Sequence, residues 1–159
     1  MAEIKVEDIA PLLCEAHGVE PRADRPCLFL RGLLTPEECT ELVAFSETKH
    51  DQAGEPGMGV RSEFTHADSA LSAQIWTRLA PFLPAKLDGG AALGLRSTWH
   101  HAKYFPGQWV FAHMDQRQTS EEHVQDASVA SRITLNLYLD DGYEGSEFIF
   151  VRVNALERT

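Results

Sequence analysis

The sequence predicts an α+β fold, with helices in its first half and strands in its second half. Two segments before residue 85 combine a helix-start signal with apolar residues at helical spacing. From Leu93 onward the chain is rich in aromatic and β-branched residues, which favour strands.

The chain of 159 residues has the length of one domain. We expect a leader with a short helix over residues 1–26 and one domain over residues 27–159. Its 24 acidic and 14 basic side chains give a formal net charge of −10. Nucleic acids and anionic membranes attract clustered positive charge, so this composition argues against both as partners.

Three cysteines, Cys14, Cys27 and Cys39, form no Cys-x-x-Cys pair, and their odd count favours reduced thiols in a cytosolic protein. The acidic start of the chain lacks the apolar core of a signal peptide. No apolar run approaches the ~20 residues of a membrane-spanning helix. We therefore expect a cytoplasmic protein, and a nuclear location stays open.

The first half predicts one strand and one helix. The apolar run over residues 27–30 suits a strand. Thr35 can cap a helix, Pro36 suits its first position, and Glu38 stands where a capping box needs it. The buried stripe of this helix is supplied by Leu42, Val43 and Phe45. Residues 53–59, rich in Gly and Pro, predict a loop without regular structure.

A second helix is predicted to start at an Asp68 cap and to end at Pro81 and Pro84. Its apolar residues at helical spacing are Leu71, Ile75, Trp76 and Leu79. A turn is expected over residues 88–90. Strand formers follow between Trp99 and Phe111, broken by a Pro-Gly pair at residues 106–107.

After a polar loop over residues 119–131, the strand with the clearest signal is predicted over residues 132–139. One face carries Ile133, Leu135, Leu137 and Leu139, and the other carries Thr134, Asn136 and Tyr138. The polar face could be the wet side of an edge sheet, or it could line a ligand pocket in a barrel. A turn over residues 140–145 and a strand over residues 147–153 complete the prediction.

One short motif has the residue types of a metal site. His113 and Asp115 lie two residues apart, so both side chains point to the same side of an extended chain and can reach one ion. A His and carboxylate set with open positions suits Fe(II) in oxygenases. Taken alone, the motif is weak, because a surface histidine beside a solvated aspartate is the commoner explanation.

Five short runs in the second half follow one another in a distinctive order: Tyr104-Phe105-Pro106-Gly107-Gln108, Phe111, His113-Met114-Asp115, Thr134-Leu135-Asn136-Leu137-Tyr138-Leu139-Asp140-Asp141 and Tyr143-Glu144-Gly145-Ser146-Glu147-Phe148. Together they resemble the Fe(II)/2-oxoglutarate-dependent dioxygenases, in the prolyl 4-hydroxylase-like branch. The resemblance covers about residues 28–151. It implies N-terminal helices packed on a double-stranded β-helix, or jelly roll, of about eight strands.

The resemblance makes His113 and Asp115 two of three iron ligands. It places Tyr104 and Tyr138 where hydroxyls bind 2-oxoglutarate, although either tyrosine could equally be a core residue with its hydroxyl at the rim. Asn136 shares a face with Tyr138 and is a weaker pocket candidate. The implied cofactors are Fe(II), 2-oxoglutarate and ascorbate. The implied reaction couples oxidative decarboxylation of 2-oxoglutarate to hydroxylation, by O2, of an unidentified peptide or small molecule.

Two features depart from the family pattern. Gly145-Ser146-Glu147 replaces a Gly-Gly-Glu turn, and no histidine follows Phe150 to act as third ligand, nor a matching basic residue to anchor 2-oxoglutarate. We therefore expect a chain truncated at its C-terminus, with four or five strands, unpaired edges and low solubility. The alternatives are a catalytically dead module that binds a partner or competes with the full-length enzyme, and a small metal hydrolase.

Overall fold

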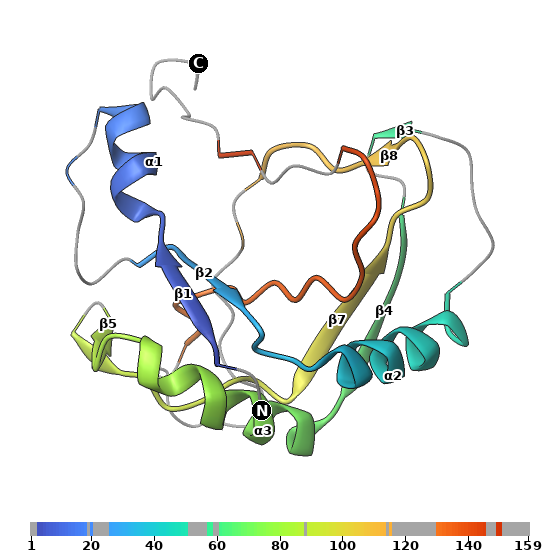
Figure 1. Cartoon of the computed structure of the whole chain (residues 1–159), viewed down its shortest axis with the longest axis horizontal. Helices are drawn as coiled ribbons and strands as arrows, with labels where there is room; N and C mark the ends of the chain where they lie inside the picture. Colours follow the sequence, from blue (N-terminus) through green and yellow to red (C-terminus); the bar gives the residue numbers. More distant parts are fainter. Residues whose placement is uncertain are drawn as a thin grey trace.

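The computed structural model describes residues 3–18, 20, 26–50, 57–58, 61–87, 89–113, 115, 130–145 and 149–150. Within these residues the fold is a mixed α+β arrangement (Figure 1), as the sequence predicts. The helices are α1 (Ala10–His17), α2 (Pro36–Glu47), α3 (Ser69–Leu79) and the short 3-10 helix η1 (Ala80–Phe82). The strands are β1 (Lys5–Asp8), β2 (Leu28–Arg31), β3 (Gly57–Met58), β4 (Ser62–Ala67), β5 (Lys86–Leu87), β6 (Gly90–Ala91), β7 (Thr98–Lys103) and β8 (Gln108–Trp109).

The described strands form separate pairs and no closed barrel. Antiparallel pairs join β1 to β2, β4 to β7 and β5 to β6, while β3 and β8 pair in parallel. The longest pair, β4 with β7, runs in register from Ser62 opposite Lys103 to Ala67 opposite Thr98. This pair places the start of β4 beside the chain that leads to the predicted metal motif.

Both helix starts predicted from the sequence are confirmed. The Thr35 hydroxyl accepts from the Glu38 amide at 3.2 Å, and the Glu38 carboxylate accepts from the Thr35 amide at 2.8 Å, which completes a capping box. Asp68 caps α3 by accepting from the Leu71 amide at 2.8 Å.

The core lies against α3. Ile75 is fully buried, and Leu33 and Leu79 pack with it, so the apolar stripe predicted for this helix is confirmed in part. In α2 the predicted stripe is only half-buried, and the buried residue is Ser46. The half-buried side chains around the core are Ile4, Leu30, Leu34, Leu71, Leu83, Leu95, Trp99, Leu135 and Leu137.

The strand predicted over residues 132–139 does not form. The alternation itself is present, because Leu135, Leu137 and Leu139 are half-buried while the intervening residues are exposed, but Ile133 is exposed as well. No described strand pairs with this segment, which crosses the view between β2 and β7 (Figure 1). Alternation determines which face packs on the core, but a β-strand also requires a partner for its backbone hydrogen bonds.

Five described strands were not predicted, namely β1, β3, β4, β5 and β6. All four residues of β1 are exposed, so the sequence shows no alternation of apolar and polar residues there. The strand forms because its backbone pairs with β2, which begins 20 residues after β1 ends. Gly57–Met58 forms β3 within the predicted loop, so that prediction is wrong at these two residues. The predicted turn near residue 89 is confirmed as the connection of β5 to β6. The predicted polar loop lies outside the described residues except at 130–131, and the predicted last strand except at 149–150.

None of the helices in the described part of the chain is both long and apolar enough to cross a membrane.

Candidate metal and co-substrate site

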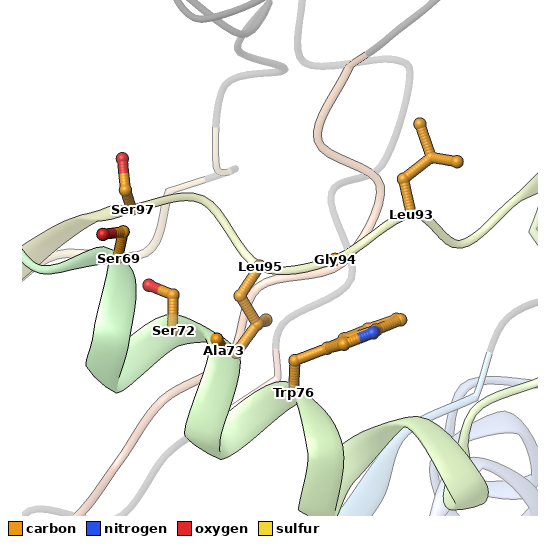
Figure 2. Close-up of a pocket in the computed structure, with 8 residues that line it drawn as sticks. All are labelled: Ser69, Ser72, Ala73, Trp76, Leu93, Gly94, Leu95 and Ser97. Atoms are coloured by element: carbon orange, nitrogen blue, oxygen red, sulfur yellow. The ribbon is translucent and has the colours of Figure 1, made fainter.

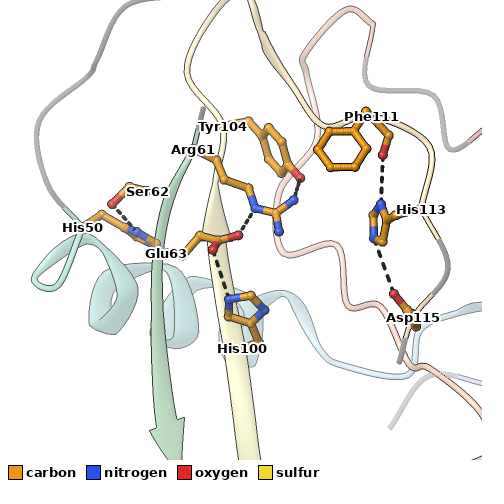
Figure 3. Close-up of polar contacts among 9 residues, drawn as sticks. All are labelled: His50, Arg61, Ser62, Glu63, His100, Tyr104, Phe111, His113 and Asp115. Atoms are coloured by element: carbon orange, nitrogen blue, oxygen red, sulfur yellow. Dashed lines mark hydrogen bonds and ion pairs between the residues drawn. The ribbon is translucent and has the colours of Figure 1, made fainter. Parts of the chain in front are cut away.

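The two predicted metal ligands lie together. His113 and Asp115 follow β8 in a segment without regular structure, and both side chains are about half exposed. The His113 Nε2 atom is 3.5 Å from the Asp115 Oδ1 atom (Figure 3). The two side chains named by the motif therefore lie next to each other.

Each of these side chains is oriented by a second contact. The Nδ1 atom of His113 is 2.9 Å from the Phe111 carbonyl oxygen, which can only accept, so Nδ1 carries a proton. In the neutral form of the ring, Nε2 is then the atom with the free lone pair. The other carboxylate oxygen of Asp115 accepts from the Thr134 hydroxyl at 2.5 Å. Such outer contacts hold metal-ligating side chains in place.

The geometry fits shared binding of one cation. Metal–nitrogen and metal–oxygen bonds of about 2.0–2.2 Å place two neighbouring ligand atoms about 3 Å apart at a right angle. A small side-chain rotation would bring the two observed atoms to that separation. Among the described residues, no group of three His, Cys, Asp or Glu side chains could hold a metal. His123, a histidine of the predicted polar loop over residues 119–131, lies outside the described residues.

Other histidines of the described part have different surroundings. The His100 Nε2 atom lies 3.6 Å from a Glu63 carboxylate oxygen. His101 accepts or donates a hydrogen bond with the Ser46 hydroxyl at 2.8 Å and stacks on Phe64. Neither lies in a group with the predicted ligands that could hold a metal.

Tyr104, predicted to bind 2-oxoglutarate, is exposed and has a cationic partner. The Arg61 Nη1 atom donates to the Tyr104 hydroxyl at 2.7 Å, and the guanidinium carbon lies 5.6 Å from the centre of the Tyr104 ring. Arg61 also forms an ion pair with Glu63 (Figure 3). Sequence reasoning did not select Arg61, because its partner is 43 residues away. The signal is the strand register, since Ser62 opposite Lys103 puts Arg61 beside Tyr104.

The second predicted tyrosine, Tyr138, is 55 % exposed. Partial burial raises the pKa of Tyr138, and the Tyr143 and Tyr104 hydroxyls raise it further. Asn136 is exposed on the same face of its segment as Tyr138, as predicted.

The segment over residues 130–145 contributes one contact to the predicted metal pair, the hydrogen bond from Thr134 to Asp115. Asn136 and Tyr138 lie in the same segment.

A shallow pocket of about 270 Å³ lies elsewhere, between α3 and residues 93–97 (Figure 2). It is lined by Ser69, Ser72, Ala73, Trp76, Leu93, Gly94, Leu95 and Ser97. Its lining contains no titratable group and none of the residues predicted to be functional, so we assign it no part in the chemistry.

Comparison of the chain with protein-family models, with curated proteins and with solved structures found no match.

Proposed function

We propose that the protein is an Fe(II)- and 2-oxoglutarate-dependent dioxygenase, a hydroxylase of the prolyl 4-hydroxylase-like type. The observation that carries the proposal is the 3.5 Å separation of His113 Nε2 and Asp115 Oδ1, with the other polar atom of each side chain held by its own hydrogen bond. The ordered motifs support it.

In this proposal His113 and Asp115 hold the iron, and the Tyr104 and Tyr138 hydroxyls bind 2-oxoglutarate. Asn136, on the same exposed face, is a further polar contact for ligand. The Phe111 carbonyl holds a proton on Nδ1 of His113, so that Nε2 of the neutral ring would be the metal-binding atom, and Thr134 holds one carboxylate oxygen of Asp115 so that the other would face the metal. When bound, iron with 2-oxoglutarate and O2 supplies the oxidation of a peptide or small-molecule substrate, and ascorbate keeps the metal reduced.

The proposal extends to the fold and the location. The segment over residues 132–139 would correspond to one strand of a jelly roll, because its apolar face already packs on the core through Leu135 and Leu137. The thiols and the acidic composition favour the cytoplasm.

The test is iron-dependent conversion of 2-oxoglutarate to succinate by the purified protein. We expect turnover in the wild type and a loss of at least about 100-fold in His113→Ala, because removal of a ligand takes away both affinity and geometry. His100→Ala is the matched control, since His100 is exposed and paired with Glu63 instead. Equal succinate formation by wild type and His113→Ala contradicts the proposal.

A second candidate is a binding module without turnover. One observation favours it, namely that His113 and Asp115 have no third His, Cys, Asp or Glu ligand among the described residues. Iron binding that depends on His113, with no succinate formed, would support this alternative.

A further inference from the structure

We propose that His66 and His101 bind one Cu(I) ion between them, at a site separate from His113 and Asp115. The ion would be held by a ring nitrogen of His66 and by the Nε2 atom of His101. Both rings lie where α2 packs on the β4–β7 pair (Figure 1), and neither belongs to the motifs that suggested the proposed function. The inference therefore does not depend on that function.

The register of β4 and β7 brings the two histidines together. Phe64 lies opposite His101, and His66 follows Phe64 by two residues, so the two histidines are diagonal neighbours on the half-buried face of the pair. Their ring centres are 6.1 Å apart. Two imidazole rings that share one ion have centres about 5–6.5 Å apart, because each metal–nitrogen bond is about 2.0 Å long. The observed separation lies near the upper end of this range, which corresponds to a nearly linear arrangement of the two nitrogens about the ion.

The Nε2 atom of His101 is a ligand atom without a partner. It is buried and makes no hydrogen bond within the described residues, whereas Nδ1 lies 2.8 Å from the Ser46 hydroxyl. When the Ser46 oxygen accepts from Nδ1, Nε2 carries the lone pair that a metal requires. Burial lowers the pKa of His101, and the nearby histidines lower it further, which favours the neutral ring that binds metals.

The ring nitrogens of His66 are available as well. In the part of the chain that the structure describes, this ring contacts Phe45 and His101 and makes no hydrogen bond. A cation between the two rings would therefore give each histidine a partner for a nitrogen that now has none.

The surroundings favour a monovalent ion over a divalent one. The Phe64 ring stacks on His101 with centres 4.4 Å apart, and the Phe45 ring centre lies 4.7 Å from that of His66. None of the described contacts of the two histidines involves a carboxylate that could balance a second charge. Transfer of a divalent ion out of water costs about four times as much as transfer of a monovalent ion of the same size, and aromatic faces attract a cation.

The number of ligands points to copper among the monovalent ions. No set of three His, Cys, Asp or Glu side chains that could hold a metal occurs among the residues that the structure describes, so the ion must be stable with two protein ligands. Cu(I) accepts two ligands in a linear arrangement, and imidazole is a usual ligand of copper.

The simpler interpretation makes both histidines packing residues and leaves the buried Nε2 atom unpaired. The two interpretations differ in what Cu(I) does to individual atoms. The proposed site requires binding at Nε2 of His101, because Ser46 occupies Nδ1, whereas packing residues would show no binding at either nitrogen.

The first test is histidine-selective 15N NMR of the full chain, titrated with Cu(I) in the absence of oxygen. Thiolates are preferred ligands of Cu(I), so a variant with all three cysteines replaced by serine removes their competition. We expect one equivalent of Cu(I) to shift the Nε2 resonance of His101 and one ring nitrogen of His66, and to leave His100 and His113 unchanged. The same shifts in the unsubstituted chain, once its thiols are saturated, make the result independent of the cysteine substitutions.

The second test measures the Kd for Cu(I) by competition with the chromogenic chelator bicinchoninate. We expect His66→Gln and His101→Gln each to weaken binding by at least about 100-fold, because removal of one of two ligands destroys the chelate. His66→Met should retain part of the affinity, since a thioether is also a Cu(I) ligand. His100→Gln is the matched control, because His100 is exposed on the opposite face of β7, and it should stay within about twofold.

Three results would overturn the inference. The first is a Cu(I) titration that shifts no ring nitrogen of His66 or His101. The second is unchanged affinity in both His66→Gln and His101→Gln, and the third is an equal loss of affinity in His100→Gln.

Discussion

His101 is the described histidine whose surroundings oppose its charge most clearly. Its ring stacks on Phe64 with centres 4.4 Å apart, and its Nε2 atom is buried without a hydrogen-bond partner among the described residues. Burial lowers the pKa of His101, and the nearby His66, His50 and His100 lower it further. The groups that face it from α2 are the Ser46 hydroxyl, at 2.8 Å from Nδ1, and the Phe45 ring.

The lowered pKa of His101 predicts a pH-dependent stability. Because the folded chain binds this proton less readily than the unfolded chain, the stabilisation is present above the ordinary pKa of about 6.5 and is lost as the pH falls. One such group changes the free energy of unfolding by at most about 1.4 kcal/mol per pH unit.

Denaturant unfolding at several pH values between about 5 and 8 measures the effect. His101→Gln should flatten the curve relative to the wild type. His100→Gln changes an exposed neighbour on the same strand, which has the smallest of the named effects on the His101 pKa, and should alter the curve much less. Parallel curves for wild type and His101→Gln would contradict the assignment.

At the level of elements, Glu38 links the start of α2 to α3. The same carboxylate that completes the capping box accepts from both terminal nitrogens of Arg78 at 2.7 Å, and Arg78 also donates to the Leu33 carbonyl. The Arg78 hydrogen bonds and the Thr35 amide lower the pKa of Glu38 to about 2. One side chain therefore sets both a helix boundary and a helix–helix contact.

Substitutions of Glu38 should lower the free energy of unfolding by an amount that depends on which of its two contacts they remove. We expect Glu38→Ala to lower the free energy of unfolding by about 1–2 kcal/mol, because it removes the cap and the ion pair. Glu38→Gln should cost less, since glutamine can still serve the capping box. Glu37→Ala, in the same first turn, is the control for denaturant unfolding.

The Glu38 contribution is present above about pH 4.5 and is lost as the pH falls toward 2. Equal costs for Glu37→Ala and Glu38→Ala would contradict the two roles.

The elements that were predictable from sequence depend on neighbouring residues. Thr35 and Glu38 are three positions apart, and His113 and Asp115 are two apart, so their contacts follow from local geometry. Strand pairing depends on residues far away in the sequence. The alternation over residues 132–139 therefore predicted which side chains pack on the core, but it could not predict that no described strand pairs with this segment. Arg61 escaped prediction for the same reason, because its contact with Tyr104 depends on the pairing of β4 with β7.

For the molecule as a whole, the described core is small and much apolar surface is exposed. Among the described residues, the buried hydrophobic side chains are Ala10, Leu33, Ile75, Leu79 and Leu87. Exposed ones include Leu93, at 70 %, and Ile149, at 72 %, together with Trp109, Phe111 and Phe150. Exposed apolar surface of this extent favours association.

We therefore expect the purified protein to self-associate as its concentration rises. Sedimentation or light scattering over a wide concentration range measures this, and Trp109→Ser, which removes an exposed ring, should shift the equilibrium toward monomer. A monodisperse monomer that melts cooperatively at all concentrations would contradict this expectation.

The hydrogen bond between Thr134 and Asp115 has a thermodynamic consequence under the proposed function. The segment that carries Thr134 is attached to the core by Leu135 and Leu137, without backbone pairing to a described strand. A cation at His113 and Asp115 would favour conformations in which this segment is docked. Metal binding and docking of the segment would then be thermodynamically linked. The ion would act as a ligand of the folded chain, and its concentration would determine the fraction of molecules in which the segment is docked.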